Sequence, residues 1–231
     1  MKAAYMSTAY LAPVQYYSKL IAYDEIYIET AENYPKQTYR NRCHIASANG
    51  LQVLTVPVEK STTLKTLTRD IRISNHGNWR HIHWNALVSA YNLTPFFEYY
   101  ADDFHPFYEK KYTFLLDFNE ALRSLVCTLL DIHPKIILTT TYLPSVPNDF
   151  RQAITPRHPL PDDPFTPRPY YQVFRDKHGF LPNLSIIDLL FNLGPESILY
   201  FPFFPSCLRA FSLLHPFYPS PFYLTPNSNP Q

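Results

Sequence analysis

Glycine, long apolar runs and unbalanced charge are all scarce in this chain. Its 231 residues include only 4 glycines, and neither a GxGxxG nor a GxxxxGK(S/T) motif occurs, which excludes the usual glycine-rich phosphate loops. No run approaches the ~20 apolar residues of a membrane-spanning helix, so we expect no membrane span. The net charge is +1, with 20 basic and 19 acidic residues. Such a balance argues against binding to duplex nucleic acid.

Cysteine is scarce as well. Cys43, Cys127 and Cys207 lie far apart and lack CxxC spacing. Scattered thiols in an odd number are typical of a reducing compartment rather than of a disulfide framework or a zinc site. The N-terminus contains no unbroken apolar core of the signal-peptide type. We therefore expect a cytoplasmic protein without a metal site.

Aromatic residues and proline are abundant, with 19 Tyr, 17 Phe and 23 Pro. Many phenol groups suit either a core with polar handles or a groove that meets a polar ligand. The prolines are concentrated late in the chain. We predict a single domain over residues 1–200, in which residues 144–168 form an extended, proline-rich surface loop, followed by an irregular tail at residues 201–231.

The hydrophobic pattern predicts an α/β fold, with a mixed sheet of short strands covered by helices. Short apolar segments indicate strands, and spacings of three and four indicate amphipathic helices. Pro106 should kink or end the helix in which it lies. The predicted strands are residues 5–11, 26–28, 71–73 and 136–138. Helices are predicted directly after Pro13, from Pro95 onward, and over residues 79–91, 114–130 and 186–193.

A β-hairpin is predicted around Asn49-Gly50, the dipeptide best suited to a two-residue turn. After the turn, both faces of residues 51–58 are largely apolar. We therefore expect this strand to be covered on both sides.

Three cations, Lys36, Arg40 and Arg42, come just before the hairpin. Alternation in an extended segment would place both arginines on one side, which suits two oxygens of a diphosphate. Asn41 lies between them and has an amide that can bind sugar hydroxyls. The same residue types also fit an ordinary solvated loop.

Five segments, in order, resemble motifs of the WbqC-like protein family over nearly the whole chain up to Ser197. Val14 and Gln15 depart from that family's usual glutamine-proline order, which weakens any ligand role carried over to the opening motif. The resembling segments are residues 10–17, 39–42, 54–58, the tryptophan–histidine helix with the following Pro95-Phe96-Phe97, and residues 180–190.

The resemblance implies a cytoplasmic transferase of surface-polysaccharide (O-antigen type) synthesis, and we expect no cofactor. Its reaction would move an acyl or aminoacyl group onto an amino sugar, and its partner would be a nucleotide-sugar or sugar diphosphate. In that interpretation Arg40 and Arg42 hold phosphate, and His83 takes a proton from the attacking amine. Asp102 is a second candidate base or amine anchor, and Tyr39, Asn41 and Trp79 line the sugar site.

Each of these residues also has a structural interpretation. His83 fits a satisfied core histidine, and Asp102, with Glu98 and Asp103, fits a solvated helix face. His76, His81 and His83 would make a metal site only if they converged, whereas residues two apart diverge on a helix. Asp188 fits a carboxylate that stabilises a helix N-terminus.

Two other functions remain open. A non-catalytic binding or assembly protein for envelope-biogenesis enzymes would suit the aromatic and proline excess, and binding to single-stranded RNA is disfavoured by the near-zero net charge. An enzyme should gather Arg40, Arg42 and His83 around one pocket, whereas an assembly protein should scatter them and expose an apolar patch.

Overall fold

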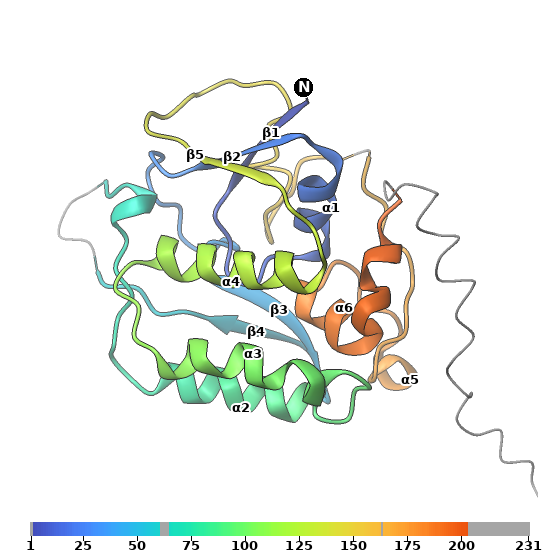
Figure 1. Ribbon diagram of the computed structural model, residues 1–231. Helices are drawn as coiled ribbons and strands as arrows, with labels where there is room; N and C mark the ends of the chain where they lie inside the picture. Colours follow the sequence, from blue (N-terminus) through green and yellow to red (C-terminus); the bar gives the residue numbers. More distant parts are fainter. Residues whose placement is uncertain (1, 61–64, 163, 203–231) are drawn as a thin grey trace, which may run out of the picture.

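The fold begins with two parallel strands joined by a helix. β1 (Ala3–Ser7) and β2 (Glu25–Glu29) pair in parallel, and α1 (Val14–Ala22) connects them. β5 (Lys135–Leu138) adds to the far side of β2, so the strand order is β1-β2-β5 (Figure 1). Alternate residues of the first two strands are fully buried, as the alternation of apolar residues requires.

The computed structural model describes residues 2–60, 65–162 and 164–202. The predicted α/β class is confirmed, but the strands form two separate sheets, one parallel and one antiparallel. No helix in this part of the chain is both long and apolar enough to cross a membrane. The predicted tail lies outside the described residues from position 203 onward.

The second sheet is the predicted hairpin, formed by β3 (Arg42–Ser47) and β4 (Gly50–Thr55). Its turn is displaced by one residue from the prediction, because Ser47 pairs with Gly50 across Ala48 and Asn49. Gly50 has a φ of 98°, whereas Asn49 has no positive φ. Glycine thus serves at the position after the turn, where a hairpin bulge requires positive φ.

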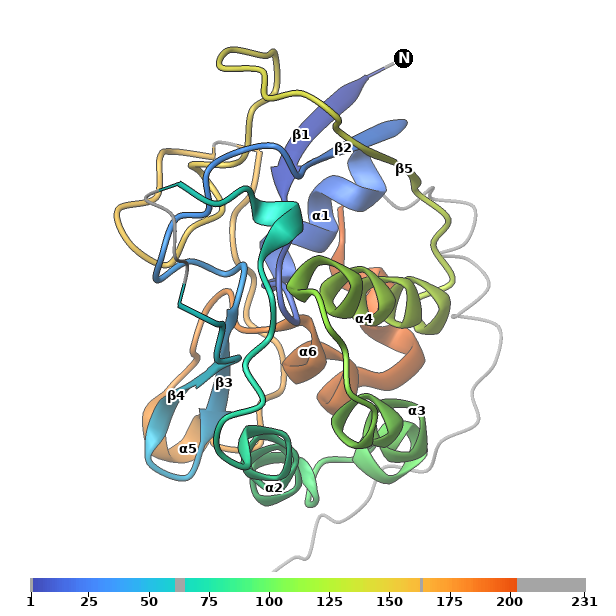
Figure 2. The same cartoon turned by 90° about the vertical axis from the view of Figure 1, so that its left-hand side faces the viewer.

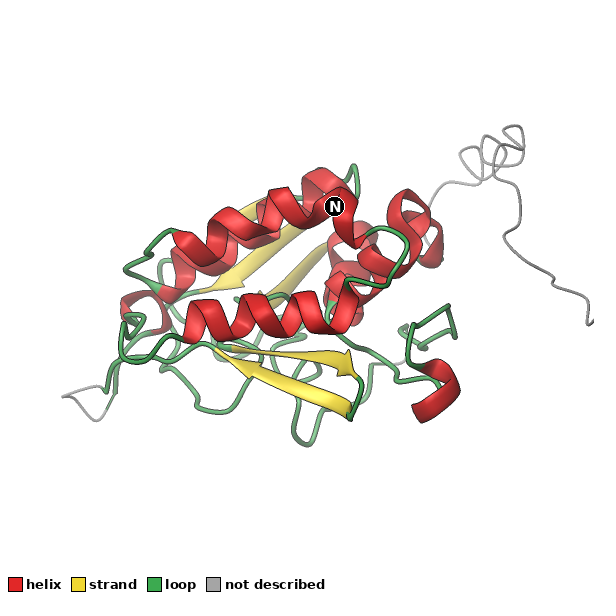
Figure 3. Ribbon diagram, turned by 90° about the horizontal axis from the view of Figure 1, so that it is seen from below, coloured by secondary structure: helices red, strands yellow, loops and turns green. Residues whose placement is uncertain are grey.

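The hairpin is covered on one face only, contrary to the prediction for its second strand. Leu51 and Val53 of β4 are 54% and 46% exposed, whereas Leu54 is buried. On β3, Cys43 and Ile45 are also buried, and α2 (Trp79–Tyr91) packs against this strand (Figure 3). A two-stranded sheet with a single packed face leaves the alternate residues in water.

The helices occur where periodicity predicts them. α2 has the predicted bounds, and α4 (Leu115–Leu129) buries apolar residues at spacings of three and four. α3 (Phe97–Glu109) continues past Pro106, so of the two predicted outcomes, a kink or an end, the helix does not end there. Proline removes one bond to the carbonyl of Asp102, and Asp102 is exposed to solvent, so water replaces that bond at little cost.

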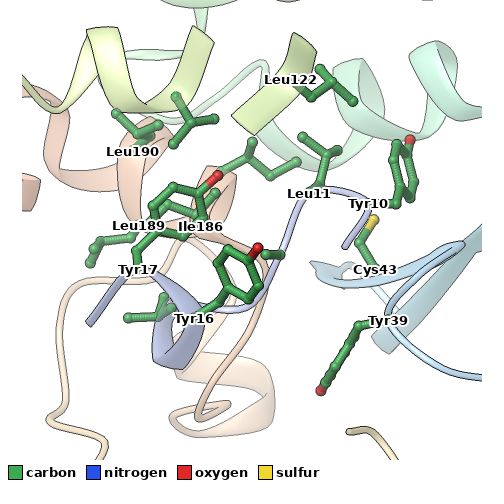
Figure 4. Packing of buried hydrophobic residues seen from close by; sticks show 14 of the residues in the cluster. Tyr10, Leu11, Tyr16, Tyr17, Tyr39, Cys43, Leu122, Ile186, Leu189 and Leu190 are labelled. Atoms are coloured by element: carbon green, nitrogen blue, oxygen red, sulfur yellow. The ribbon is translucent and has the colours of Figure 1, made fainter. Parts of the chain in front are cut away.

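α6 (Ile186–Leu193) lies at the centre of the core. Its seven residues from Ile186 to Asn192 are all buried, as is typical of a helix that is apolar on every side. The Val14 N–H donates to the Leu184 carbonyl, and the Ile186 N–H donates to the Ala12 carbonyl. These bonds join α6 to the start of α1, and Figure 4 shows side chains of both helices meeting in one cluster.

The remaining elements are short. They are the 3-10 helix η1 (Thr68–Asp70), α5 (Arg175–His178) and the 3-10 helix η2 (Gly194–Tyr200). The predicted strand at residues 71–73 is reduced to isolated bridges, in which Ile73 pairs with Val58. β1 ends at Ser7, before the predicted residue 11, where the φ of Leu11 is 40°.

The proline-rich segment at residues 144–168 is only partly at the surface. Phe150 and Ile154 are buried, and so is the guanidinium of Arg151. The Phe150 N–H donates to the Tyr5 carbonyl, which places this segment beside β1. Part of the predicted surface loop therefore belongs to the packed structure.

Candidate functional site

A cavity of about 680 Å³ lies where the segment before β3 meets the segment after β4. Its volume falls within the range of small-molecule sites, roughly 300–1,000 Å³. We call it the basic cavity, and the lining residues that matter below are Tyr34, Lys36, Asn41, Arg42, Glu59 and Lys60.

Backbone hydrogen bonds hold the two walls together. The Tyr34 N–H donates to the Thr66 carbonyl, and the Thr68 N–H donates to the Glu32 carbonyl. Nearer the hairpin, the Val56 N–H donates to the Asn41 carbonyl at 2.8 Å. Residues 32–42 therefore run beside residues 56–60 and 65–68, as Figure 2 shows for the chain leading into β3.

The lining carries more positive than negative charge. Lys36, Arg42 and Lys60 stand against one carboxylate, that of Glu59. Glu59 lies 3.5 Å from the Nε of Arg72, and both side chains are half-exposed. Because this carboxylate already has a cationic neighbour, the cavity favours an anionic ligand.

Three buried polar atoms on the lining have no hydrogen-bond partner. They are the Tyr34 hydroxyl, the Asn41 Oδ1 and the Arg42 Nε. Burial raises the pKa of Tyr34 to about 12, although the cationic charges of Arg40 and Arg42 oppose that rise. Buried polar groups are nearly always paired, so three unpartnered groups around one cavity point to a polar ligand.

Arg40 does not line the basic cavity. Its side chain is buried, its Nε donates to Glu32 at 2.8 Å, and its Nη2 donates to Glu32 and to Ser7. The alternation expected of an extended segment fails here, because residues 39 and 40 form a turn. Arg40 and Arg42 therefore face different surroundings, and Arg40 is held in a buried ion pair.

Tyr39 is also buried and borders a cavity of about 10 Å³ together with Arg40. That space is about the size of one water molecule and too small for a sugar. Burial raises the pKa of Tyr39 to about 12. Figure 4 shows Cys43 between Tyr39 and Tyr10 in this part of the core.

His83 and Trp79 lie together in the core, with ring centres 5.1 Å apart. The Nδ1 of His83 is 3.0 Å from the Tyr10 hydroxyl, which is 2.9 Å from the Tyr108 hydroxyl. Burial lowers the pKa of His83 to about 4, against the opposing effect of a hydrogen bond to the Thr55 carbonyl. The imidazole is therefore neutral at physiological pH and lines no part of the basic cavity.

Asp102 lies on the exposed side of α3 and lines none of the cavities described above. The structure thus distributes the predicted site residues over four places. Asn41 and Arg42 line the basic cavity, Tyr39 and Arg40 border the small cavity, Trp79 and His83 are in the core, and Asp102 is at the surface.

Sequence reasoning overlooked two lining residues, Tyr34 and Lys60. Lys60 belongs to a polar, threonine-rich connection that has the pattern of a plain linker. Only the pairing of residues 32–42 with residues 56–60 and 65–68 brings it near Arg42. That pairing leaves no signal in the sequence pattern.

Asp188, interpreted from the sequence as a carboxylate that stabilises a helix N-terminus, is buried in α6 and has partners that the sequence did not indicate. It accepts hydrogen bonds from the hydroxyls of Tyr91 and Tyr170, at 2.9 and 2.6 Å, and from the Gln172 amide at 3.0 Å. Burial raises its pKa to about 6, and the three donors oppose that rise. The available signal was a single acidic residue within an otherwise apolar helix.

Within the described residues, no group of three or more His, Cys, Asp or Glu side chains is arranged to hold a metal ion. Cys43 and Cys127 are buried thiols, and Cys207 lies outside those residues.

The WbqC-like protein family matches residues 8–155 of the chain. The chain belongs to this family. The uncharacterized protein Rv1507c of Mycobacterium tuberculosis is 30% identical over 222 residues, which cover 85% of this chain and 95% of that relative. No solved structure matches the chain. In this WbqC-like protein the matched residues include the whole lining of the basic cavity, whereas α6 lies beyond them.

Proposed function

We propose that this WbqC-like protein binds a phosphorylated sugar, as a nucleotide-sugar or sugar diphosphate, in the basic cavity. The observation that carries the proposal is the buried, unpartnered Nε of Arg42 on a lining that also bears Lys36 and Lys60. Guanidinium groups bind phosphate oxygens through charge-assisted hydrogen bonds, and lysines add positive charge. The family resemblance supports a ligand that belongs to surface-polysaccharide synthesis.

The reaction that we attach to this binding is transfer of an acyl or aminoacyl group onto an amino sugar. It rests on the family resemblance. A non-catalytic binding or assembly protein is the second candidate, and a specific observation favours it: His83 and Asp102 both lie away from the basic cavity. Arg40, Arg42 and His83 are scattered, as expected of that second candidate.

Titration calorimetry with UDP-N-acetylglucosamine and UDP-glucose tests the proposed binding. Arg42→Ala should weaken binding by roughly 10- to 100-fold, because a hydrogen bond to a charged group contributes about 1.5–3 kcal/mol. Arg175→Ala is the matched control, since Arg175 is an exposed arginine on α5 outside the cavity lining. Unchanged affinity in Arg42→Ala would rule out the proposed site.

An acyl-transfer assay with an amino-sugar nucleotide then separates the two candidates. If the wild-type protein transfers the group and Arg42→Ala, which lacks a residue of the cavity lining, loses that transfer, the enzymatic candidate stands. If the wild-type protein binds the sugar nucleotide but transfers nothing from acyl-CoA or aminoacyl donors, the binding and assembly candidate stands.

A further inference from the structure

The unpartnered atoms of the basic cavity differ in what they require. The Arg42 Nε–H can only donate, so it needs an acceptor such as a phosphate oxygen. Asn41 is 7% exposed, and its Nδ2 donates to the Val56 carbonyl at 2.9 Å. That bond fixes the orientation of the amide, because an amide oxygen in the same place would face another oxygen. The Asn41 Oδ1 therefore needs a donor.

Both requirements can be met by a single ligand, because Asn41 and Arg42 line the same cavity. Asn41 and Arg42 are consecutive residues, their Cα atoms are about 3.8 Å apart, and both line the cavity. In a sugar 1-phosphate, the substituent closest to the phosphate-bearing carbon is the one on C2. A hydroxyl or an acetamido N–H at that position is a donor.

We infer that the Asn41 Oδ1 accepts a hydrogen bond from a donor on C2 of a sugar whose C1 phosphate is bound by Arg42. This inference rests on the proposed function and makes the ligand class narrower: 2-hydroxy or 2-acylamino sugar 1-phosphates and their nucleotide diphosphates. The Tyr34 hydroxyl can donate or accept a hydrogen bond, and in this arrangement it bonds to a hydroxyl farther along the sugar ring.

A ligand without that donor binds more weakly for a definite reason. A ligand that carries the donor gives the buried Asn41 Oδ1 the partner that it lacks in the free protein, whereas a ligand without the donor leaves it unpaired. Leaving one buried acceptor unpaired costs about 1–3 kcal/mol, which corresponds to roughly 5- to 150-fold in affinity.

The test compares glucose 1-phosphate, 2-deoxyglucose 1-phosphate and 2-deoxy-2-fluoroglucose 1-phosphate by calorimetry on the full chain. Wild-type protein should bind the first at least about fivefold more tightly than the other two. The fluoro compound matters because fluorine is similar in size to a hydroxyl and cannot donate. If all three bind equally, the inference is wrong.

Two variants test whether Asn41 is the residue that causes the preference for a donor on C2. Asn41→Leu should reduce the ratio between glucose 1-phosphate and its 2-deoxy analogue to about 1, while retaining the phosphate contact through Arg42. Tyr34→Phe should weaken both ligands and leave their ratio unchanged. A wild-type ratio retained in Asn41→Leu would overturn the assignment, and if that variant does not fold, the wild-type comparison with the fluoro analogue still decides.

The two proposals fail in different ways. If none of the sugar phosphates binds, the proposed function fails and takes the inference with it. If all of them bind equally and Arg42→Ala weakens the binding of each, the proposed function stands. Only the proposed hydrogen bond between Asn41 and the C2 donor is then wrong.

Discussion

Arg40 and Arg42 are separated by one residue, and the structure gives them opposite environments. Arg42 has a buried Nε without a partner on the lining of the basic cavity, whereas Arg40 is enclosed with Glu32 and Ser7. The same residue type is therefore left without a partner on a cavity lining at one position and held in a buried ion pair at the other. The difference arises from the turn at residues 39–40, not from the residue type.

Arg40→Ala should lower the free energy of unfolding by roughly 3–5 kcal/mol, because it leaves the buried carboxylate of Glu32 without its cation. Arg42→Ala should change it by less than about 1 kcal/mol, since no bond of its side chain is lost. Urea denaturation measures both. As a control, Arg40→Met combined with Glu32→Leu should recover most of the loss, because an apolar pair replaces both charges together. Equal effects of the two alanine variants would contradict this division of roles.

At this scale the sequence indicates which residue types matter but not which partners they have. The basic residues before the hairpin predict an anion site, and Asn41 and Arg42 do line the basic cavity. The sequence cannot show that Arg40 pairs with Glu32 and does not line that cavity, because this contact depends on the turn between them. That the cavity binds phosphate stays a prediction.

Single elements were predicted more accurately than their surroundings. Periodicity locates α2 and α4, and Gly194-Pro195 marks the end of α6. The hairpin was found from Asn49-Gly50, but the covering of its faces was not, because exposure depends on whether another element packs there. Leu51 and Val53 are apolar and remain in water.

Gly194 ends α6 in a conformation that other residues adopt only with strain, with φ 56° and ψ −133°. A Cβ at this position would lie 2.5 Å from ring atoms of Phe96. Gly194→Ala should therefore be destabilising twice, by roughly 1–2 kcal/mol for the backbone and by roughly 1–3 kcal/mol for overpacking.

Gly77→Ala is the matched control for Gly194→Ala in thermal denaturation. Gly77 also has positive φ, 73°, but a Cβ there would meet nothing within 4 Å. Its variant should show the backbone cost alone. If the two variants melt at the same temperature, the contact with Phe96 contributes nothing to stability.

The whole molecule combines two buried groups whose ionisation responds to pH in opposite senses. The pKa of Asp188 is raised from 3.8 to about 6, so its stabilising contribution is complete below pH 3.8 and is lost as the pH rises through about 6. The pKa of His83 is lowered from 6.5 to about 4, so its contribution is complete above pH 6.5 and is lost as the pH falls through about 4. Each amounts to roughly 3 kcal/mol, and between pH 4 and 6.5 the two nearly cancel.

Removing either group should reveal the effect of the other on the pH dependence of stability. Asp188→Asn should become more stable as the pH rises from 4.5 to 6.5, whereas His83→Gln should become less stable over the same range. Urea denaturation at three pH values measures both slopes, relative to the nearly flat contribution of the pair in the wild-type protein. Two variants with the same slope as the wild type would show that neither group carries a shifted pKa.

The order of the strands could not be predicted from the sequence. β5 joins β2 from more than a hundred positions along the chain, since Lys135 pairs with Glu25. Short apolar segments reveal that strands exist but not which ones are neighbours. The match to the family ends at residue 155, yet α6 is the most completely buried helix of the core.

The bonds between the start of α1 and the segment entering α6 have a consequence for how this protein is made. Pro13 pairs with Ser185, so nearly two hundred residues leave the ribosome before the earliest helix meets the one that buries it. Until then the nascent chain exposes tyrosines and isoleucines that are sealed in the finished protein, a situation in which aggregation competes with folding. Slow translation or a holding chaperone should therefore affect the yield of this protein more than that of a chain built from local contacts.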